Sequence, residues 1–458
     1  MACSRRRFPI WHLPPQRGTV QRPGRLAEGP ADAMCRRHLG AACGHAPLCR
    51  RRAGSIVRAN SDDREDGGMA ELTMRVKAWY GDEIISLAIP DSWNVETSRL
   101  PHTTSMTSSA MAAAIDDPFG SASLTTLAAD AGSAAIIVED MTRPTPTDKI
   151  VPLLLDRLHA SGLDEDSIRF VLALGCHRQM PREEMAKKLG RDIVGRYEVL
   201  NHDLDGRFEY CGRSTRGTPI YIPEAVMGAD LKLIIGTTYP RSGTGFGGGA
   251  KCLVPGVAGQ ATIETYHKLP GGETLSTDSE MRQDIEEIAR RVGIDFIVNA
   301  VLNGDREIVG LFCGDIVEAH RAAADHVKQV SLFPTVPEAD VVVSNAYPFD
   351  TNMRYTWRGT WPFAHHRDAL KILVDFATEG AGYHQLFKAG GRPFATRSDG
   401  EPSWRLYSPI IGPKEAYEVH PNCELYTEWE KLVELVEGRA GPSPTVAFYP
   451  HAGVAWAT

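Results

Sequence analysis

Short apolar runs recur along the chain, and several are followed by segments with helical periodicity. The run at 134–138 precedes an amphipathic segment at 149–160, whose apolar residues recur at helical spacing. The run at 170–174 precedes a segment that starts at Pro181, and proline is favoured at the first position of a helix. Further strands are expected at 231–235, 295–302, 308–312, 340–344 and 445–449. This alternation of strands and helices predicts an α/β fold with mainly parallel, doubly wound sheets.

The same pattern predicts the domain organisation. Residues 1–68 lack hydrophobic periodicity and are rich in arginine, proline and glycine, so we expect a disordered extension there. Residues 69–338 are expected to form an N-terminal α/β domain that opens with a β-hairpin at 72–90, turning at Gly81. Residues 339–458 are expected to form a second α/β domain, with the active-site crevice between the two domains.

Charge is distributed unevenly along the 458 residues. Residues 1–68 hold thirteen arginines, no lysine and six acidic residues, a balance of +7, so the net charge of −8 leaves −15 for the remainder. The arginine-rich start resembles a transit-type leader, or an upstream extension of a chain that begins at Met69. The acidic remainder has no basic cluster, which argues against a nucleic-acid partner. No apolar run is long enough to suggest a membrane helix, so no membrane partner is expected.

Cysteines are scattered through the chain after residue 68, as Cys176, Cys211, Cys252, Cys313 and Cys423. Such spacing is typical of reduced thiols in a large protein, which favours a cytoplasmic location. Cys252 could be a nucleophile, but no paired histidine is evident nearby, and a buried thiol is the more ordinary interpretation.

A glycine-rich stretch at 236–267 carries the most informative chemistry. Glycine lets backbone N–H groups approach a bound group closely, and phosphate is the usual beneficiary. Lys251 ends the glycine string, and His267 lies sixteen residues later on a predicted short helix at 260–267. An ordinary glycine turn is the alternative, whereas a Walker A loop fits poorly because Ser or Thr does not follow Lys251. The lysine and histidine together suggest a bound cofactor that could be covalently held.

Polar residues follow the ends of three predicted strands. Asp140 and Arg143 follow the first, His177 follows the second, and Arg241 and Lys251 follow the third. Ligands of open α/β sheets bind along the carboxyl edge of the strands. We therefore expect these clusters to converge on one crevice.

Each of these residues has a functional and a structural interpretation. His177 can serve as a general acid or base, or can simply hydrogen-bond a loop. Arg143 can clamp a carboxylate or phosphate, or can pair with Asp140. Lys251 can form a covalent link or neutralise a phosphate, and His267 can ligate a metal through one imidazole nitrogen.

Several motifs, in order and with matching spacing, resemble the nickel-dependent lactate racemases and their homologues. The resemblance extends from about residue 76 to the C-terminus. It rests on DMTRPTP (140–146), LGCHR (174–178), NHD (201–203), TRGTPIYI (215–222), GFGGGAKCLVPGVAG (245–259) with His267, and AYPFD (346–350).

The resemblance implies a cofactor. It is the nickel pincer nucleotide, pyridinium-3-thioamide-5-thiocarboxylic acid mononucleotide, linked to Lys251, with His267 completing the nickel coordination. Carbon, two sulfurs and a nitrogen in a square plane are donors that suit nickel. Cofactor-synthesis enzymes are the partners implied for maturation. The other residues implied or expected to bind the cofactor are Asp140, Thr142, Arg143, Gly247, Gly248 and Gly249.

The implied reaction is racemisation or epimerisation of a small 2-hydroxy acid, by hydride transfer from C2 to the cofactor and back. His177 matches one of the family's two acid/base histidines, and Arg143 matches a residue that binds substrate or cofactor anions. Arg241 occupies the position of the second acid/base histidine and is therefore a catalytic candidate. Tyr355 and Arg358 stand where a glutamine and a lysine would bind the substrate carboxylate.

These departures change the expected substrate. An arginine stays protonated, so Arg241 is a poor base but a good anion clamp. We therefore expect a 2-hydroxy acid larger or more acidic than lactate, or an epimerisation in which another residue, such as His365 or His366, serves the second face. The alternatives are a dehydrogenase- or dehydratase-like homologue, and a non-catalytic protein that binds the cofactor.

Overall fold

A six-stranded sheet forms the first part of the fold, in the order β14-β13-β10-β5-β6-β7. All neighbours in it are parallel except β13 and β14, which are antiparallel. The strands are β5 (Ala134–Glu139), β6 (Ile168–Ala173), β7 (Glu198–Asn201), β10 (Leu231–Thr237), β13 (Phe296–Leu302) and β14 (Ile308–Gly314). The structure is a computed structural model that describes residues 54–58, 70–384 and 401–457, all within one unit, Arg50–Thr458.

The central strands of this sheet are buried on both faces. Every residue of β5, β10 and β13 is buried. Along β5, Ile136 and Val138 pack into one hydrophobic cluster and Ile137 into another, because side chains alternate between the faces of a strand. Burial on both faces requires continuous apolar runs. This is why the sequence located these strands correctly.

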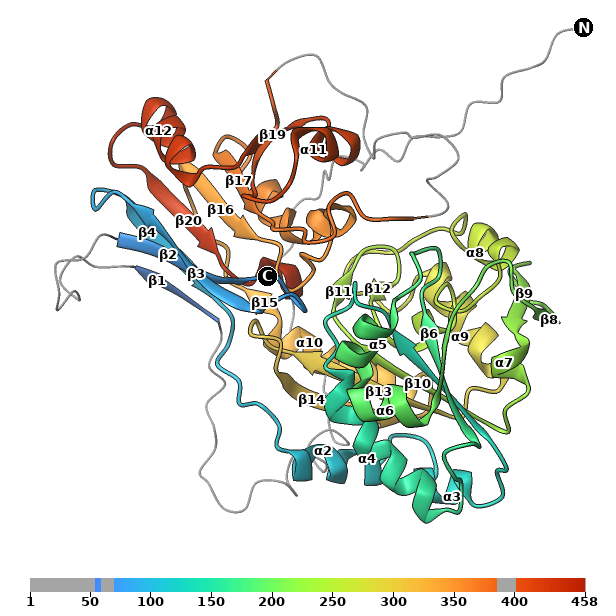
Figure 1. The fold of residues 1–458 in the computed structure, drawn as a ribbon. Helices are drawn as coiled ribbons and strands as arrows, with labels where there is room; N and C mark the ends of the chain where they lie inside the picture. Colours follow the sequence, from blue (N-terminus) through green and yellow to red (C-terminus); the bar gives the residue numbers. More distant parts are fainter. Residues whose placement is uncertain (1–53, 59–69, 385–400, 458) are drawn as a thin grey trace, which may run out of the picture. The chain divides into compact units, whose positions relative to one another are not determined.

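Helices cover the two faces of the six-stranded sheet (Figure 1). One face packs against α2 (Ser108–Asp116), α3 (Leu124–Ala128), α4 (Thr147–Ala160), α5 (Arg182–Leu189) and α6 (Arg191–Arg196). The other packs against α7 (Glu224–Met227), α8 (Gln260–Tyr266), α9 (Glu280–Val292) and the start of α10 (Glu318–Val330). The predicted helices at 149–160, after Pro181 and at 260–267 are confirmed within a few residues.

A seven-stranded sheet forms the second part, in the order β1-β4-β20-β16-β17-β18-β19. It is parallel except for the β1–β4 pair. Its strands are β1 (Ser55–Arg58), β4 (Asn94–Arg99), β16 (Val341–Asn345), β17 (Leu370–Val374), β18 (Trp404–Tyr407), β19 (Cys423–Tyr426) and β20 (Thr445–Tyr449). Helices α11 (Pro413–Val419) and α12 (Trp429–Ala440) accompany it. The mainly parallel α/β fold is therefore confirmed.

The early hairpin, β2 (Ala70–Val76) and β3 (Glu83–Ile89), forms as predicted but packs with the second sheet. Leu72 and Met74 share a hydrophobic cluster with Val341 and Val343 of β16. Asn345, at the end of β16, donates hydrogen bonds from Nδ2 to the carbonyls of Arg75 (2.8 Å) and Pro450 (3.0 Å). The domain boundary between residues 338 and 339 stays a prediction. Strands β2, β3 and β4, which precede residue 100, lie in or pack against the seven-stranded sheet, most of whose strands come after residue 339.

Part of the stretch expected to be disordered is ordered. Residues 55–58 form β1, which pairs antiparallel with β4, so the expectation for 1–68 is wrong at this point. The short segment SIVR gains its hydrogen bonds from a strand far along the chain, which local composition does not reveal. The remainder of 1–68 lies outside the described residues.

Shorter elements complete the connections. They are β8 (Phe208–Arg213), β9 (Pro219–Pro223), β11 (Pro240–Arg241), β12 (Gly245–Phe246), β15 (Leu332–Phe333) and β21 (Trp456–Ala457), with the 3₁₀ turns η2 (Gly249–Cys252), η3 (Met353–Gly359), η4 (Trp361–Ala364) and η6 (Ala452–Val454). Each described cysteine is a free thiol. Among the helices of the described ranges, none is long and apolar enough to cross a membrane.

Candidate active site

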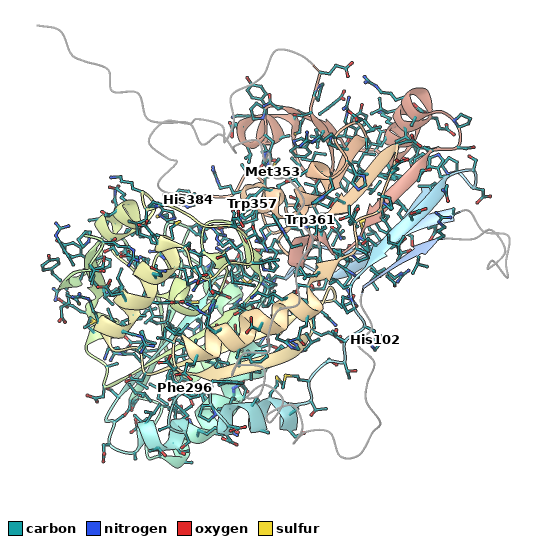
Figure 2. All side chains as sticks on the ribbon, turned by 180° about the vertical axis from the view of Figure 1, so that it is seen from behind. His102, Phe296, Met353, Trp357, Trp361 and His384 are labelled. Carbon is teal, nitrogen blue, oxygen red and sulfur yellow. The ribbon has the colours of Figure 1, made fainter. Side chains whose placement is uncertain are left out.

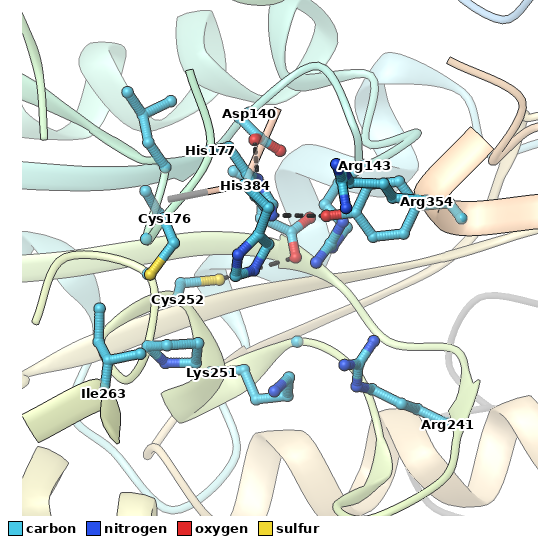
Figure 3. A pocket seen from close by; sticks show the side chains of 18 of the residues that line it. Asp140, Arg143, Cys176, His177, Arg241, Lys251, Cys252, Ile263, Arg354 and His384 are labelled. Carbon is cyan, nitrogen blue, oxygen red and sulfur yellow. Dashed lines mark hydrogen bonds and ion pairs between the residues drawn. The ribbon is translucent and has the colours of Figure 1, made fainter. Parts of the chain in front are cut away.

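A pocket of about 250 Å³ lies at the carboxyl ends of β5, β6 and β10. Asp140 follows β5, His177 follows β6, and Arg241 follows β10, and all of them line it together with Lys251 (Figure 3). The polar clusters expected at three strand ends therefore do meet in one place. Residues beyond β16 complete the wall, namely Arg354, Tyr355, Trp357 and His384.

His177 is held between a carboxylate and a phenol. Its Nδ1 lies 2.5 Å from Oδ2 of Asp140, and its Nε2 lies 2.5 Å from the hydroxyl oxygen of Tyr355. Burial alone would raise the pKa of Asp140, but His177, Arg143 and Thr142 outweigh it and hold that pKa well below its ordinary value. Asp140 is thus a carboxylate that can only accept, so Nδ1 of His177 carries the hydrogen. The remaining Nε2 lone pair gives His177 the form of a general base.

Arg143 reaches Asp140 through a hydroxyl group. Its Nη1 donates to Oγ1 of Thr142 (2.7 Å), and that hydroxyl donates to Oδ1 of Asp140 (2.5 Å). The Arg143 guanidinium also lies 4.9 Å from the centre of the Tyr355 ring. Thr142 itself borders a smaller adjoining pocket rather than the main one. Arg143 therefore adds positive charge to the main pocket while it orders the loop that carries Asp140.

Lys251 lies in η2, and its amine binds a proton less tightly than an ordinary lysine does. Burial lowers its pKa well below the ordinary lysine value, and the positive charges of Arg241, Arg282 and Arg143 lower it further. Its Nζ lies 3.5 Å from the hydroxyl of Tyr266 and 5.6 Å from the centre of that ring. The neutral amine is the nucleophilic form, so the lowered pKa favours covalent attachment of a ligand at Lys251.

His267 caps the end of α8 and also lines the pocket. Its Nδ1 lies 2.7 Å from the carbonyl oxygen of Ile263, so Nδ1 donates and the Nε2 lone pair is left for another partner. Burial, with the nearby Lys251, lowers the pKa of His267 to about 4, so the ring is neutral near pH 7. Metal-binding histidines are commonly oriented in this way by a backbone carbonyl.

Few of the described side chains near His267 could bind a metal together with it. Within the part of the chain that the structure describes, no cluster of three or more His, Cys, Asp or Glu side chains could hold a metal ion. Cys252 is buried, and burial together with Glu139 raises its pKa well above the ordinary thiol value, so it is a protonated thiol rather than a ligand. A metal held by His267 would therefore need further donors, from a bound group or from water.

Two glycines of the string allow close packing between the loop and neighbouring side chains of the protein. A Cβ atom on Gly247 would lie 2.5 Å from the Tyr239 ring, and one on Gly249 would lie 2.8 Å from His320. Gly248 has φ of +70°, and it alone of the three consecutive glycines lines the pocket. The expectation that all three contact the cofactor thus finds direct geometric support only at Gly248.

Arg282 holds the glycine string in place from beneath. Its fully buried guanidinium donates to the carbonyls of Thr244 (3.3 Å), Phe246 and Gly248 (3.4 Å). Sequence reasoning missed this residue, because a buried arginine in an amphipathic helix looks like any surface arginine. Arg282 is a positioning residue for the loop that carries Lys251.

Two arginines expected near the substrate have different surroundings. Arg241 lines the pocket with its guanidinium 5.7 Å from the centre of the Trp357 ring, and it forms no hydrogen bond or ion pair with any described residue. Arg358 is only 5% exposed, donates to the carbonyls of Pro240 and Gly453, and stacks between Tyr239 and Phe349. Arg358 does not line the pocket, whereas Arg241 is available to an anion.

The histidines proposed for the second face lie elsewhere. His366 is buried with Nε2 2.9 Å from the Tyr449 hydroxyl, His365 is exposed, and neither lines the pocket. His384, which sequence reasoning missed, does line it, and its ring centre lies 5.5 Å from that of His177. Figure 2 labels His384 close to Trp357, and Figure 3 shows its imidazole projecting into the pocket. No motif surrounds His384, so only the fold could reveal it.

Comparison with known proteins points to one group of relatives. Residues 80–277 match the family described as the lactate racemase N-terminal domain. A lactate racemase from Lactiplantibacillus plantarum is 33% identical over 291 residues, which cover 59% of this chain and 68% of the relative. A lactate racemase from Thermoanaerobacterium thermosaccharolyticum is 29% identical over 296 residues, which cover 61% of this chain and 69% of the relative.

Two solved structures share the fold. The lactate racemase apoprotein from Thermoanaerobacterium thermosaccharolyticum gives a TM-score of 0.66 at 20% identity and covers 85% of this chain and 100% of that one. A protein from Thermotoga maritima gives a TM-score of 0.56 at 17% identity, and the match covers 78% of this chain and 100% of that one. At these identities the likeness concerns the fold alone.

The first prediction concerns Arg282. Replacing it in Arg282→Met leaves three buried loop carbonyls without their donor, while Glu286 keeps its ion pair with Arg321, and should lower the free energy of unfolding by about 3–5 kcal/mol. Chemical denaturation measures the loss, and hydrogen exchange should show faster exchange at 244–251. The control is Arg290→Met, an exposed arginine paired with Asp315, which should change stability by about 0.5 kcal/mol or less. Equal stabilities of the two variants would contradict the positioning role.

The second prediction concerns the amine of Lys251. Because its pKa is lowered, the reactive neutral form is present at lower pH than for a surface lysine such as Lys414. Competitive acylation of the apoprotein, followed by peptide mass spectrometry across pH, should therefore label Lys251 with a midpoint well below the ordinary lysine value. In Arg241→Gln the midpoint should rise, since one repelling charge is gone. A midpoint in the ordinary range in the wild type would refute the neutral amine.

Proposed function

The chain belongs to the lactate racemase family, and we propose that it racemises or epimerises a 2-hydroxy acid with the nickel pincer nucleotide as its cofactor. The observation that carries the proposal is the presence, in one pocket, of a lysine amine whose pKa is lowered, a neutral histidine with Nε2 available, and an Asp140–His177 pair. Together these supply an attachment point, a metal ligand and a proton acceptor.

Lys251 and His267 are the residues that would hold the cofactor. The Lys251 amine would carry it through a thioamide, and the Nε2 of His267 would bind the nickel. Gly248 lines the same pocket and offers a surface without a side chain. When bound, this group supplies a reversible acceptor for the C2 hydride of the substrate.

Protons would be handled by the residues after β5 and β6. His177 would hold the proton of the substrate hydroxyl at Nε2, and the carboxylate of Asp140, 2.5 Å from Nδ1, would stabilise the imidazolium that results. Asp140 is buried, and its other oxygen accepts hydrogen bonds from the N–H and the hydroxyl of Thr142, which hold the carboxylate in place for this role.

The arginines of the pocket favour an anionic substrate larger or more acidic than lactate. Arg143, Arg241 and Arg354 all line the pocket, and Arg241 lacks an acidic partner among the described residues. A second carboxylate on the substrate would supply that partner in bidentate form. This agrees with the presence of arginine where the family resemblance implies a histidine.

A racemase also needs a proton carrier for the other enantiomer. Three histidines line the described part of the pocket. His177 pairs with Asp140 and His267 is the expected metal ligand, which leaves His384. Burial and the nearby His177 lower the pKa of His384 to about 3, so its imidazole is neutral near pH 7. We propose His384 for this role.

The third prediction tests the activity. Protein co-produced with the cofactor-synthesis enzymes should invert C2 of at least one 2-hydroxy acid in a panel of mono- and dicarboxylic acids, followed by chiral chromatography. A dicarboxylic acid should exceed lactate in kcat/KM by about 10-fold or more, because a charged hydrogen bond contributes about 1.5–3 kcal/mol. In Arg241→Gln that preference should shrink.

The outcomes of the panel separate the competing functions. Nickel-loaded protein that leaves every acid unchanged would refute the racemase. Loss of the C2 hydrogen without inversion would instead indicate a dehydrogenase- or dehydratase-like homologue.

The fourth prediction concerns His384. Replacement in His384→Gln removes the second proton carrier and should lower racemisation by about 100-fold or more. His365→Gln is the control, because that histidine is exposed and outside the pocket. Racemisation at the wild-type rate in His384→Gln would remove this residue from the account.

A further inference from the structure

The Nε2 atom of His177 is already occupied by a protein group. The hydroxyl oxygen of Tyr355 lies 2.5 Å from it, while Nδ1 lies 2.5 Å from Asp140. In the neutral imidazole Asp140 fixes the hydrogen on Nδ1, so Nε2 accepts and the Tyr355 hydroxyl donates. A substrate hydroxyl in the pocket therefore finds Nε2 of His177 already hydrogen-bonded to Tyr355.

Tyr355 is built into the wall at this point. It belongs to η3, whose first turn is capped by the side chain of Asn352, and its ring stands edge-on to that of His177, with centres 5.8 Å apart. Tyr355 is itself buried yet lines the pocket. Its oxygen donates its hydrogen to His177, is also hydrogen-bonded by Arg143, and keeps a lone pair that can accept a hydrogen bond from a ligand.

The charges around Tyr355 allow it to pass a proton. Burial raises the pKa of the Tyr355 phenol, so it rests in the protonated form, while the positive charge of Arg143 opposes that rise and would stabilise negative charge on the oxygen. Behind it, His177 can accept the proton, and Asp140 is a carboxylate that stabilises an imidazolium. The order Tyr355, His177, Asp140 thus leads from the pocket into the protein.

We infer that Tyr355 is a further catalytic residue that exchanges the proton of the substrate hydroxyl, with His177 and Asp140 as the relay behind it. As the substrate O–H bond breaks, its proton bonds to the Tyr355 oxygen, and the proton of Tyr355 bonds to Nε2 of His177. The return step reverses both transfers. The relay moves only protons, so it needs no oxidant of its own. This inference rests on the proposed function and deepens it, since the family resemblance assigns Tyr355 only to substrate binding.

Two experiments on the holoenzyme test the relay. Tyr355→Phe removes only the hydroxyl and should lower kcat by about 100-fold or more with KM changed by less than about threefold. The double variant Tyr355→Phe/His177→Gln should be no slower than the slower single variant, because both residues act on one proton path. Tyr417→Phe, at an exposed tyrosine, should match the wild type. A rise in KM with kcat retained, or multiplicative losses in the double variant, would overturn the relay in favour of binding alone.

A third experiment decides the inference without turnover. In apoprotein labelled with ¹⁵N-histidine, His177 should show hydrogen on Nδ1 and a hydrogen-bonded, unprotonated Nε2, and Tyr355→Phe should shift the Nε2 resonance to that of a free acceptor. Thermal unfolding confirms that the variant is folded. Hydrogen found on Nε2 in the wild type would overturn the relay even if racemisation occurs. Conversely, a holoenzyme that racemises nothing would overturn the proposed function. The Nε2 resonance of His177 in the apoprotein would still show whether Tyr355 donates its hydrogen to His177.

Discussion

The site depends on two nitrogen atoms whose pKa values the protein lowers inside a positively charged pocket. Burial and three arginines lower the pKa of Lys251, burial lowers that of His267, and the carbonyl of Ile263 orients His267 so that its Nε2 is available. The same arginines attract anions, so the pocket repels protons from its own nucleophile and draws acidic ligands toward it. Attachment of a cofactor and binding of an acid substrate thus have one electrostatic cause.

The fold supplies this arrangement through the carboxyl edge of a parallel sheet and the segment beyond β16. Strands β5, β6 and β10 are fixed by burial on both faces, so the residues just after them have little freedom. Arg282 hydrogen-bonds carbonyls of the glycine string. Tyr355 and His384, which lie far from it in the sequence, line the pocket on another side. Residues that follow the strands of the first sheet thus supply the groups that we propose for cofactor binding, and residues beyond β16 supply those that we propose to complete the proton chemistry.

What the sequence could predict follows the same division. Central strands were found because two-sided burial demands continuous apolar runs. Lys251, His267 and His177 were singled out because they lie in ordered motifs, and the structure brings all three to one pocket. Gly247 and Gly249 were assigned to the cofactor because a glycine needed for packing against Tyr239 or His320 looks like one needed for a ligand. Arg358 and His384 were misjudged or missed because aromatic stacking and loop closure join residues far apart in the chain.

The proposed function depends on Lys251 carrying a nickel-binding group whose coordination His267 completes. Intact-mass spectrometry with nickel analysis, on protein co-produced with the cofactor-synthesis enzymes, detects this group. We expect a mass adduct on Lys251 with one nickel per chain, no adduct in Lys251→Ala, and an adduct with weakened nickel retention in His267→Ala. An unmodified Lys251 with no bound nickel in the wild type, under conditions that load a lactate racemase relative, would contradict it.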